Sequence, residues 1–151
     1  MGHKEISIVR IDGDKQVFMP LLLEGDESRR MIDGYLDCGE LFVAYSGSVA
    51  VAVCVVVILN DSLVEVKNLA VDSGWRRKGI GRMMLGYVET RYPGSAIQLG
   101  TGETPSTMKF YQSCGFDVSH HVPDFFTINY DHPIVEDGIV LKDMVYLKKK
   151  P

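Results

Sequence analysis

The spacing of apolar and polar residues predicts a set of strands in the first half of the chain. Residues 4–11 alternate between apolar and polar, as in a strand with one buried face. Residues 49–59 form an unbroken apolar run rich in valine, and residues 41–45 precede it across a Ser-Gly-Ser segment. We expect a hairpin whose second strand is buried on both faces. Residues 63–71 follow an Asn-Asp turn and predict the next neighbouring strand.

Four segments have the spacing and end signals of helices. Residues 15–23 and 27–36 predict two short helices. Residues 79–91 repeat apolar side chains at helical spacing and stop before a Pro-Gly pair. Residues 105–114 begin with proline after a threonine that can cap the first turn, and a glycine follows their end.

The remaining segments complete the expected order of elements. Residues 96–99 predict a short strand, 118–130 an irregular strand that contains a proline, and 139–147 a last alternating strand. The order βααβββαβαββ predicts an α/β (α+β, mixed-sheet) fold with helices on both faces of the sheet. No repeat, linker or low-complexity segment interrupts the 151 residues, so we expect a single domain over residues 1–151.

Composition narrows the range of partners. A net charge of -4 argues against nucleic-acid binding, which needs clustered cations. The longest apolar run, residues 49–59, is too short to span a membrane as a helix, and the charges within residues 1–10 do not fit a secretion signal. Three cysteines without a C-x-x-C pair predict reduced thiols. We therefore expect a cytoplasmic protein that binds neither nucleic acid nor membrane.

Residues 71–82 (VDSGWRRKGIGR) form a basic segment within this acidic chain. Gly79 and Gly81 open the predicted helix directly after a strand, and a helix N-terminus attracts phosphate through its unpaired N–H groups and dipole. The segment lacks the third glycine of a dinucleotide fingerprint and the Gly-Lys-Ser/Thr ending of a P-loop. A glycine-opened helix with a solvated basic face is the alternative interpretation. The surrounding cations are Arg76, Arg77, Lys78 and Arg82.

Two motifs together resemble the GNAT superfamily of N-acetyltransferases. The first is Arg76-x-x-Gly79-x-Gly81 after an apolar strand, and the second is Phe110-Tyr111-x-x-x-Gly115-Phe116. The resemblance implies acetyl-CoA as co-substrate and a largely antiparallel central sheet that is splayed at the cofactor strand. The chain departs from the family where Thr104 and Thr107 replace the frequent Asn and Ala. Its later part resembles an uncharacterised bacterial subgroup, through the patterns Asp124-Phe125-Phe126, Tyr130-x-x-Pro133-Ile134-x-Glu136-x-Gly138 and Asp143-Met144.

The resemblance also implies roles for individual residues. Tyr111 is the expected acid that protonates the departing thiolate, because a phenol is protonated at neutral pH. Glu65, in the cofactor strand, is the expected general base, with an exposed carboxylate paired to Lys67 as the alternative. A backbone N–H within residues 69–71 is expected to bind the thioester oxygen. The cofactor-binding set is Leu69, Ala70, Val71, Arg76, Arg77, Lys78, Gly79, Ile80, Gly81, Arg82 and Thr104.

The acceptor site is expected to come from residues 27–39 and 119–137. Four acidic residues there would suit a cationic amine or be solvated loop charges, and three aromatic residues would wall a pocket or pack in the core. Adjacent histidines on a strand point to opposite faces, so we expect no metal site. The acidic residues are Asp124, Asp131, Glu136 and Asp137, the aromatic residues Phe125, Phe126 and Tyr130, and the histidines His120, His121 and His132.

The leading hypothesis is an N-acetyltransferase that acts by direct transfer to a primary amine in a ternary complex. A small-molecule amine is favoured as acceptor, and a homodimer is possible because small domains of this family often pair through sheet edges. Two alternatives stay open: a CoA-binding sensor or partner module without catalysis, and an acetyltransferase for protein lysines or N-termini.

Overall fold

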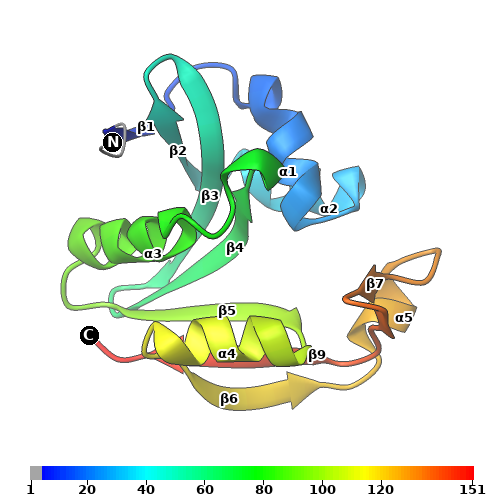
Figure 1. The fold of residues 1–151 in the computed structure, drawn as a ribbon. Helices are drawn as coiled ribbons and strands as arrows, with labels where there is room; N and C mark the ends of the chain where they lie inside the picture. Colours follow the sequence, from blue (N-terminus) through cyan, green and yellow to red (C-terminus); the bar gives the residue numbers. More distant parts are fainter. Residues whose placement is uncertain (1–4) are drawn as a thin grey trace.

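A seven-stranded sheet forms the centre of the protein (Figure 1). The computed structural model describes residues 5–151, so residue 4, where the first strand was predicted to begin, lies outside the described part. All neighbouring strands are antiparallel except the central pair β4–β5, which is parallel. The spatial order is β1 (Ile6–Arg10), β2 (Glu40–Ser46), β3 (Val49–Asn60), β4 (Leu63–Val71), β5 (Ala96–Gly102), β9 (Met144–Lys149) and β6 (Asp117–Val122).

Helices cover both faces of this sheet, as the order of elements predicted. One face carries α3 and α4, which lie in front of the sheet in Figure 1. The other face carries α1 and α2, which pack on β2 and β3. The helical segments are η1 (Lys15–Phe18), α1 (Met19–Gly25), α2 (Arg29–Leu36), η2 (Ser73–Trp75), α3 (Ile80–Arg91), α4 (Pro105–Ser113) and α5 (Phe125–Asn129).

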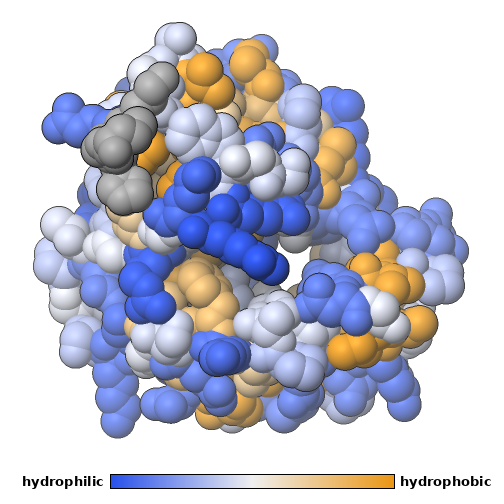
Figure 2. Space-filling view, viewed as in Figure 1, coloured by the Kyte–Doolittle hydropathy of each residue, from blue (hydrophilic) through white to orange (hydrophobic). Residues whose placement is uncertain are grey.

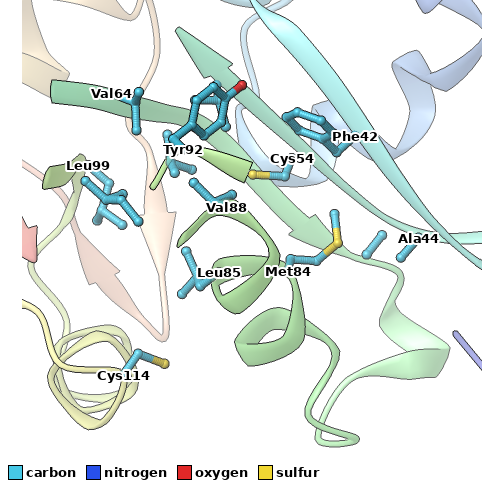
Figure 3. Packing of buried hydrophobic residues seen from close by; sticks show 14 of the residues in the cluster. Phe42, Ala44, Cys54, Val64, Met84, Leu85, Val88, Tyr92, Leu99 and Cys114 are labelled. Carbon is cyan, nitrogen blue, oxygen red and sulfur yellow. The ribbon is translucent and has the colours of Figure 1, made fainter. Parts of the chain in front are cut away.

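The strand β3 is buried on both faces, as its unbroken apolar run predicted. Cys54 and Val56 face α3, where they pack with Met84 and Val88 (Figure 3). Val53 and Val55 point the opposite way, into a second apolar cluster beneath α1 and α2. The alternation places one core layer on each side of the sheet, and both layers hold β4 in position.

The parallel pair β4–β5 separates after four residues. Leu63–Val66 of β4 pair with Ala96–Leu99 of β5, and beyond this ladder the two strands diverge. A bulge on β4 opposite Val55 and Val56 adds Lys67 as an extra residue. Because a bulge reverses the alternation, Val64 and Val66 face α3 while Asn68 and Ala70 face α1. The resulting wedge in the sheet is the splay that the family resemblance implied.

The C-terminal third differs from the expected pair of strands. The irregular strand predicted for residues 118–130 is β6 followed by the short helix α5, because Pro123 lacks the N–H that would continue the ladder and Asp124 has φ 56°. The single strand predicted for residues 139–147 is divided into β8 (Ile139–Val140), which pairs with β7 (Val135–Glu136), and β9. Asp137 and Gly138 have φ 50° and 75°, the conformation of a tight hairpin turn.

Candidate active site

A cleft of about 740 Å³ opens where β4 ends and α3 begins. Figure 2 shows this face hollowed beside the lobe that contains α5 and β7, with hydrophilic residues along the rim. The walls come from the end of β4, the loop before α3, one face of α4 and the β7–β8 turn. The lining residues are Glu24, Leu69, Ala70, Val71, Trp75, Arg76, Arg77, Gly79, Ile80, Gly81, Arg82, Ser106, Thr107, Phe110, Tyr111, Glu136 and Asp137.

The backbone conformation of the loop before α3 suits the binding of an anion. Arg77 has φ 62° and Gly79 has φ 79°, while Lys78 lies between them without a positive φ. Such alternation turns successive N–H groups toward a common point, and α3 adds the positive end of its dipole. Within residues 5–151, no side chain caps the α3 N-terminus. The first amides of the helix therefore have no side-chain acceptor and can bind an anion.

The cations of the predicted segment differ in their placement. Arg76 donates to the Val71 carbonyl oxygen at 3.2 Å and pairs with Glu24 at 3.2 Å. Arg82 donates to the Ser113 carbonyl and hydroxyl oxygens at 3.1 and 2.8 Å, which holds its guanidinium beside α4. Arg77 lines the cleft and Lys78 does not. The structure thus brings three of the four predicted cations to the cleft.

Thr104 takes the N-cap position of α4 that the sequence predicted for it. Its contact with the cofactor stays a prediction. Thr104 is fully buried, and its hydroxyl accepts from the Thr107 N–H and donates to the Thr107 hydroxyl at 2.9 Å. It caps α4 and does not line the cleft, whereas Thr107 does. Thr107 and Tyr111 are four residues apart on a helix, so helical spacing alone could have indicated Thr107 as a lining residue.

Tyr111 lies at the inner end of the cleft. Its ring packs edge-on against Phe110 and Phe116, with centroids 5.0 and 5.9 Å away. Burial raises the pKa of Tyr111 above its ordinary value, with smaller contributions from Cys54, Cys114 and Glu136. Its hydroxyl therefore keeps its proton throughout the neutral range.

Glu65 is buried and lies outside the cleft lining. Its neighbours Val64 and Val66 pack beneath α3, so Glu65 is on the opposite face of β4. Its carboxylate accepts from Lys67 at 2.7 Å and from the Gln98 amide at 2.5 Å. The pairing with Lys67 matches the alternative interpretation of this residue, while the burial does not match the exposure expected with it.

A second, smaller cleft of about 200 Å³ occupies the wedge in the sheet. Residues 66–69 of β4 form one wall and residues 99–101 of β5 form the other. It shares lining residues with the first cleft, so the two form a continuous site. The shared residues are Glu24, Leu69, Thr107, Tyr111 and Glu136.

Asp26, in the loop between α1 and α2, is hydrogen-bonded to the C-terminal lobe, which comprises α5, β7 and β8. Its carboxylate accepts from the hydroxyls of Tyr35 at 3.3 Å and Tyr130 at 2.8 Å. Tyr35 in turn accepts from the Asn68 amide at 3.1 Å, and the same amide donates to the Leu22 carbonyl at 2.9 Å. Burial and the charge of Asp26 raise the pKa of both tyrosines. This network fixes the outer wall of the wedge.

The residues predicted for the acceptor site divide between the cleft and other places. Glu136 and Asp137 line the cleft. Asp124 pairs with Lys142 at 3.5 Å, and Asp131 with His132 at 2.7 Å. Phe125, Phe126 and Tyr130 pack with one another in the C-terminal lobe around Ile134 and Leu141, a small cluster separate from the core of the sheet, and they line neither cleft.

Histidines do not gather into a metal site in the described chain. His120 stacks on Tyr146 with ring centroids 4.8 Å apart, and His121 lies 3.1 Å from Glu103. Within residues 5–151, no group of three or more His, Cys, Asp or Glu side chains is arranged to hold an ion. In the same residues, no helix has the length and apolar character needed to cross a membrane.

Known proteins share this sequence and fold. The family model for the acetyltransferase (GNAT) domain matches residues 37–118. The uncharacterized N-acetyltransferase YvbK of Bacillus subtilis is 35% identical over 131 residues, which are 84% of each chain. A GNAT family acetyltransferase from Elizabethkingia anophelis, solved with acetyl-CoA bound, superposes with a TM-score of 0.90 at 30% identity over 97% of this chain and 98% of its own. A Bacillus subtilis acetyltransferase in complex with CoA gives 0.87 at 32% identity over 97% and 99%.

The chain therefore belongs to the GNAT family of acetyltransferases. It is an acyltransferase with acetyl-CoA as its co-substrate and an amine as acceptor. Both the family and the fold that the two sequence motifs implied are confirmed.

Proposed function

We propose that this enzyme acetylates a primary amine of a small cationic molecule, by direct attack in a ternary complex. The observation that carries the proposal is one continuous site in which the arginines line only the first cleft and the carboxylates extend into the second. Arg77 and Arg82 line the first cleft only, whereas Glu24, Glu136 and Tyr111 line both clefts. Arginines confined to the first cleft suit an anionic donor, and carboxylates that reach the second cleft suit a cationic acceptor.

The first cleft fits the pyrophosphate of acetyl-CoA. At Gly79, nothing lies within 4 Å of the position that a β-carbon would take, so a diphosphate can approach the backbone. The amides that begin α3 would bind it, with charge-assisted contacts from Arg77 and Arg82. When bound, acetyl-CoA would supply an activated acetyl thioester.

Roles in acetyl transfer follow from the walls of the site. Tyr111 would donate its proton to the departing sulfur, which its burial beside the wedge supports. A backbone N–H of Leu69, Ala70 or Val71 would bind the acetyl oxygen, since β4 has no ladder partner on the β5 side there. Glu65 as general base stays a prediction, and its pairing with Lys67 and Gln98 leaves it little freedom to accept another proton.

The test is incubation of the protein with acetyl-CoA and a panel of amines, with release of free thiol as the readout. The panel contains monoamines, diamines and polyamines, peptides with a free N-terminus, and peptides with an internal lysine. We expect diamines and polyamines to be acetylated with the highest kcat/KM. Acetyl-CoA binding without thiol release on any acceptor would favour a sensor, and selective modification of peptides would favour a protein acetyltransferase.

A further inference from the structure

The β7–β8 turn, which lines the cleft, is anchored to α4 and to the small core of the C-terminal lobe. Asp137 accepts a hydrogen bond from the Ser106 hydroxyl in the first turn of α4. The Leu141 N–H donates to the Ile134 carbonyl at 2.8 Å and closes the hairpin behind the turn. Ile134, Leu141 and Phe126 are buried together in the C-terminal lobe. The turn is thus fixed to α4 at one end and to a small core at the other, and Glu136 lies between these anchors.

Glu136 lies where the two clefts meet. It lines both of them, as Tyr111 does. Although the residue as a whole is exposed, loss of solvent at its carboxyl raises the pKa of Glu136, and the charges of Asp137 and Glu27 raise it further. Glu24 adds negative charge to both clefts, and Lys67 in the wedge is paired with Glu65. A base works best when its pKa approaches the operating pH.

The other carboxylates near the site are already engaged. Glu24 pairs with Arg76, Asp26 accepts from two tyrosine hydroxyls, Asp137 accepts from Ser106, and Glu65 is paired away from the cleft. No side-chain hydrogen bond or salt bridge engages the Glu136 carboxylate within residues 5–151. Of these five carboxylates, Glu136 alone both lines the site and has its oxygens free to take a proton.

We infer that Glu136 is the general base that deprotonates the acceptor amine. The inference rests on the proposed amine acetylation. The ammonium group of the acceptor gives one proton to the Glu136 carboxylate, and its lone pair then forms the bond to the acetyl carbon. The carbon–sulfur bond breaks, the sulfur receives the Tyr111 proton, and the second proton of the nitrogen restores the tyrosine hydroxyl. The proton on Glu136 returns to solvent before the next turnover.

The test compares Glu136→Gln with the wild type on amines of graded basicity. For a strongly basic alkylamine near neutral pH, we expect kcat to fall about 100-fold or more, which is the usual contribution of a general base. For a weakly basic amine such as trifluoroethylamine, which is already neutral, we expect a much smaller loss. The activity of Glu136→Gln on the alkylamine should recover as the pH rises and deprotonates the acceptor. Glu136→Asp, which keeps the carboxylate, should retain part of the rate.

Two controls test whether Glu136→Gln lowers the rate through lost catalysis, and not through misfolding or the loss of a negative charge. Glu103→Gln removes an exposed carboxylate that pairs with His121 outside the cleft, and it should leave both rates unchanged. Calorimetric titration should give the same acetyl-CoA affinity for Glu136→Gln and wild type. In NMR titrations of the ligand-free protein, one glutamate carboxyl signal should titrate above the ordinary range and be absent from Glu136→Gln.

The outcomes distinguish this inference from the proposed function. An equal loss on strongly and weakly basic amines would assign Glu136 to acceptor binding and overturn its role as base. The same holds if Glu65→Gln shows the dependence on amine basicity and Glu136→Gln does not. If the wild type acetylates no amine, the proposed function fails first and the inference falls with it.

Discussion

Three non-glycine residues among residues 5–151 have a positive φ, and one of them, Arg77, lies in the loop before α3. Arg77 is a non-glycine residue in the left-handed region, which costs about 1–2 kcal/mol for an L-residue. Gly79 adopts the same region without that cost. Strained conformations persist where the surrounding structure imposes them, and they occur often at functional sites. The strain at Arg77 therefore supports a binding role for the loop.

Gly79→Val is expected to weaken acetyl-CoA binding. A β-branched side chain at φ 79° strains the backbone by about 1–2 kcal/mol and occupies the space above the α3 amides. We expect the dissociation constant, measured by calorimetry, to rise about tenfold or more, which corresponds to about 1.4 kcal/mol. Gly94→Val is the matched control, because Gly94 has φ 82°, equally open surroundings and a position outside the cleft. Equal acetyl-CoA affinity in both variants would mean that the pyrophosphate binds elsewhere.

Tyr111→Phe is expected to lower turnover and leave acetyl-CoA affinity unchanged. The hydroxyl acts on charge that develops at the sulfur only in the transition state, so its loss should reduce kcat about 100-fold. Steady-state kinetics and calorimetry measure the two quantities separately. Tyr87→Phe is the control, since Tyr87 packs edge-on against Phe42 and lines neither cleft. Unchanged turnover of Tyr111→Phe would refute the acid assignment.

At the scale of the elements, close packing of α1 against β4 shapes the outer wall of the wedge. A β-carbon at Gly25, the last residue of α1, would collide with the Asn68 side chain and come within 3.2 Å of the Ala70 β-carbon. The Asn68 amide is also the group that binds Leu22 and Tyr35. The contact between this helix and this strand therefore depends on the absence of a side chain at one position.

Gly25→Ala is expected to destabilise the protein by about 1–3 kcal/mol, because overpacking forces α1 away from β4. Gly86→Ala provides the opposite case, since Gly86 lies in the middle of α3 with nothing within 4 Å of its β-carbon position. That substitution should stabilise by about 0.5–1 kcal/mol through helix propensity. Urea denaturation measures both changes, and a neutral Gly25→Ala would show that α1 moves without cost.

The spacing of apolar residues predicted the strands and helices in the first two thirds of the chain, because each segment there keeps one hydrophobic pattern along its whole length. The C-terminal lobe was different, since α5 has five residues and β7 and β8 have two each. Such segments are too short for a 3.6- or 2-residue repeat to be visible. Asp137-Gly138 is a hairpin dipeptide, and it was the local signal that could have divided the predicted strand at residues 139–147.

At the scale of the whole molecule, the two ends of the site differ in how far the sequence predicts them. The proposed donor end is the first cleft. Nine of the predicted cofactor-binding residues line it and lie within the segment Leu69–Arg82, so a motif in one short stretch of sequence could predict them. The acceptor end joins Glu24 from α1, the wedge of β4 and β5, and Glu136 from the β7–β8 hairpin. No local pattern connects residues so far apart in the chain, and only the fold brings them together.

Alkaline pH is expected to lower the stability of the whole protein. Burial raises the pKa of Cys54 to about 12, whereas a thiol in the unfolded chain ionises near about 8.5. Above that pH the folded state keeps a proton that the unfolded state loses, so the free energy of unfolding falls with rising pH. The slope for one thiol is about 1.4 kcal/mol per pH unit. Above about pH 10, Tyr35, Tyr92 and Tyr111, whose pKa values are also raised by loss of solvent, add to the same trend.

Urea denaturation of wild type and Cys54→Val at a series of pH values measures this contribution. The difference in slope between about pH 9 and pH 10 should equal that of one thiol. Cys38→Ser, which changes an exposed cysteine, should retain the wild-type slope. Parallel pH profiles for wild type and Cys54→Val would contradict the expected role of the buried thiol.

The early separation of β4 from β5 has a consequence for which molecules can enter the protein. Beyond Val66 and Leu99, the backbone N–H and C=O groups on the facing edges of β4 and β5 are not paired with each other. An open strand edge on a protein surface commonly recruits another polypeptide chain. Here the edge lines a cleft of about 200 Å³, which is small compared with a second folded chain. We therefore expect the gap between the two strands to admit a thin, unbranched molecule and to exclude a second folded chain.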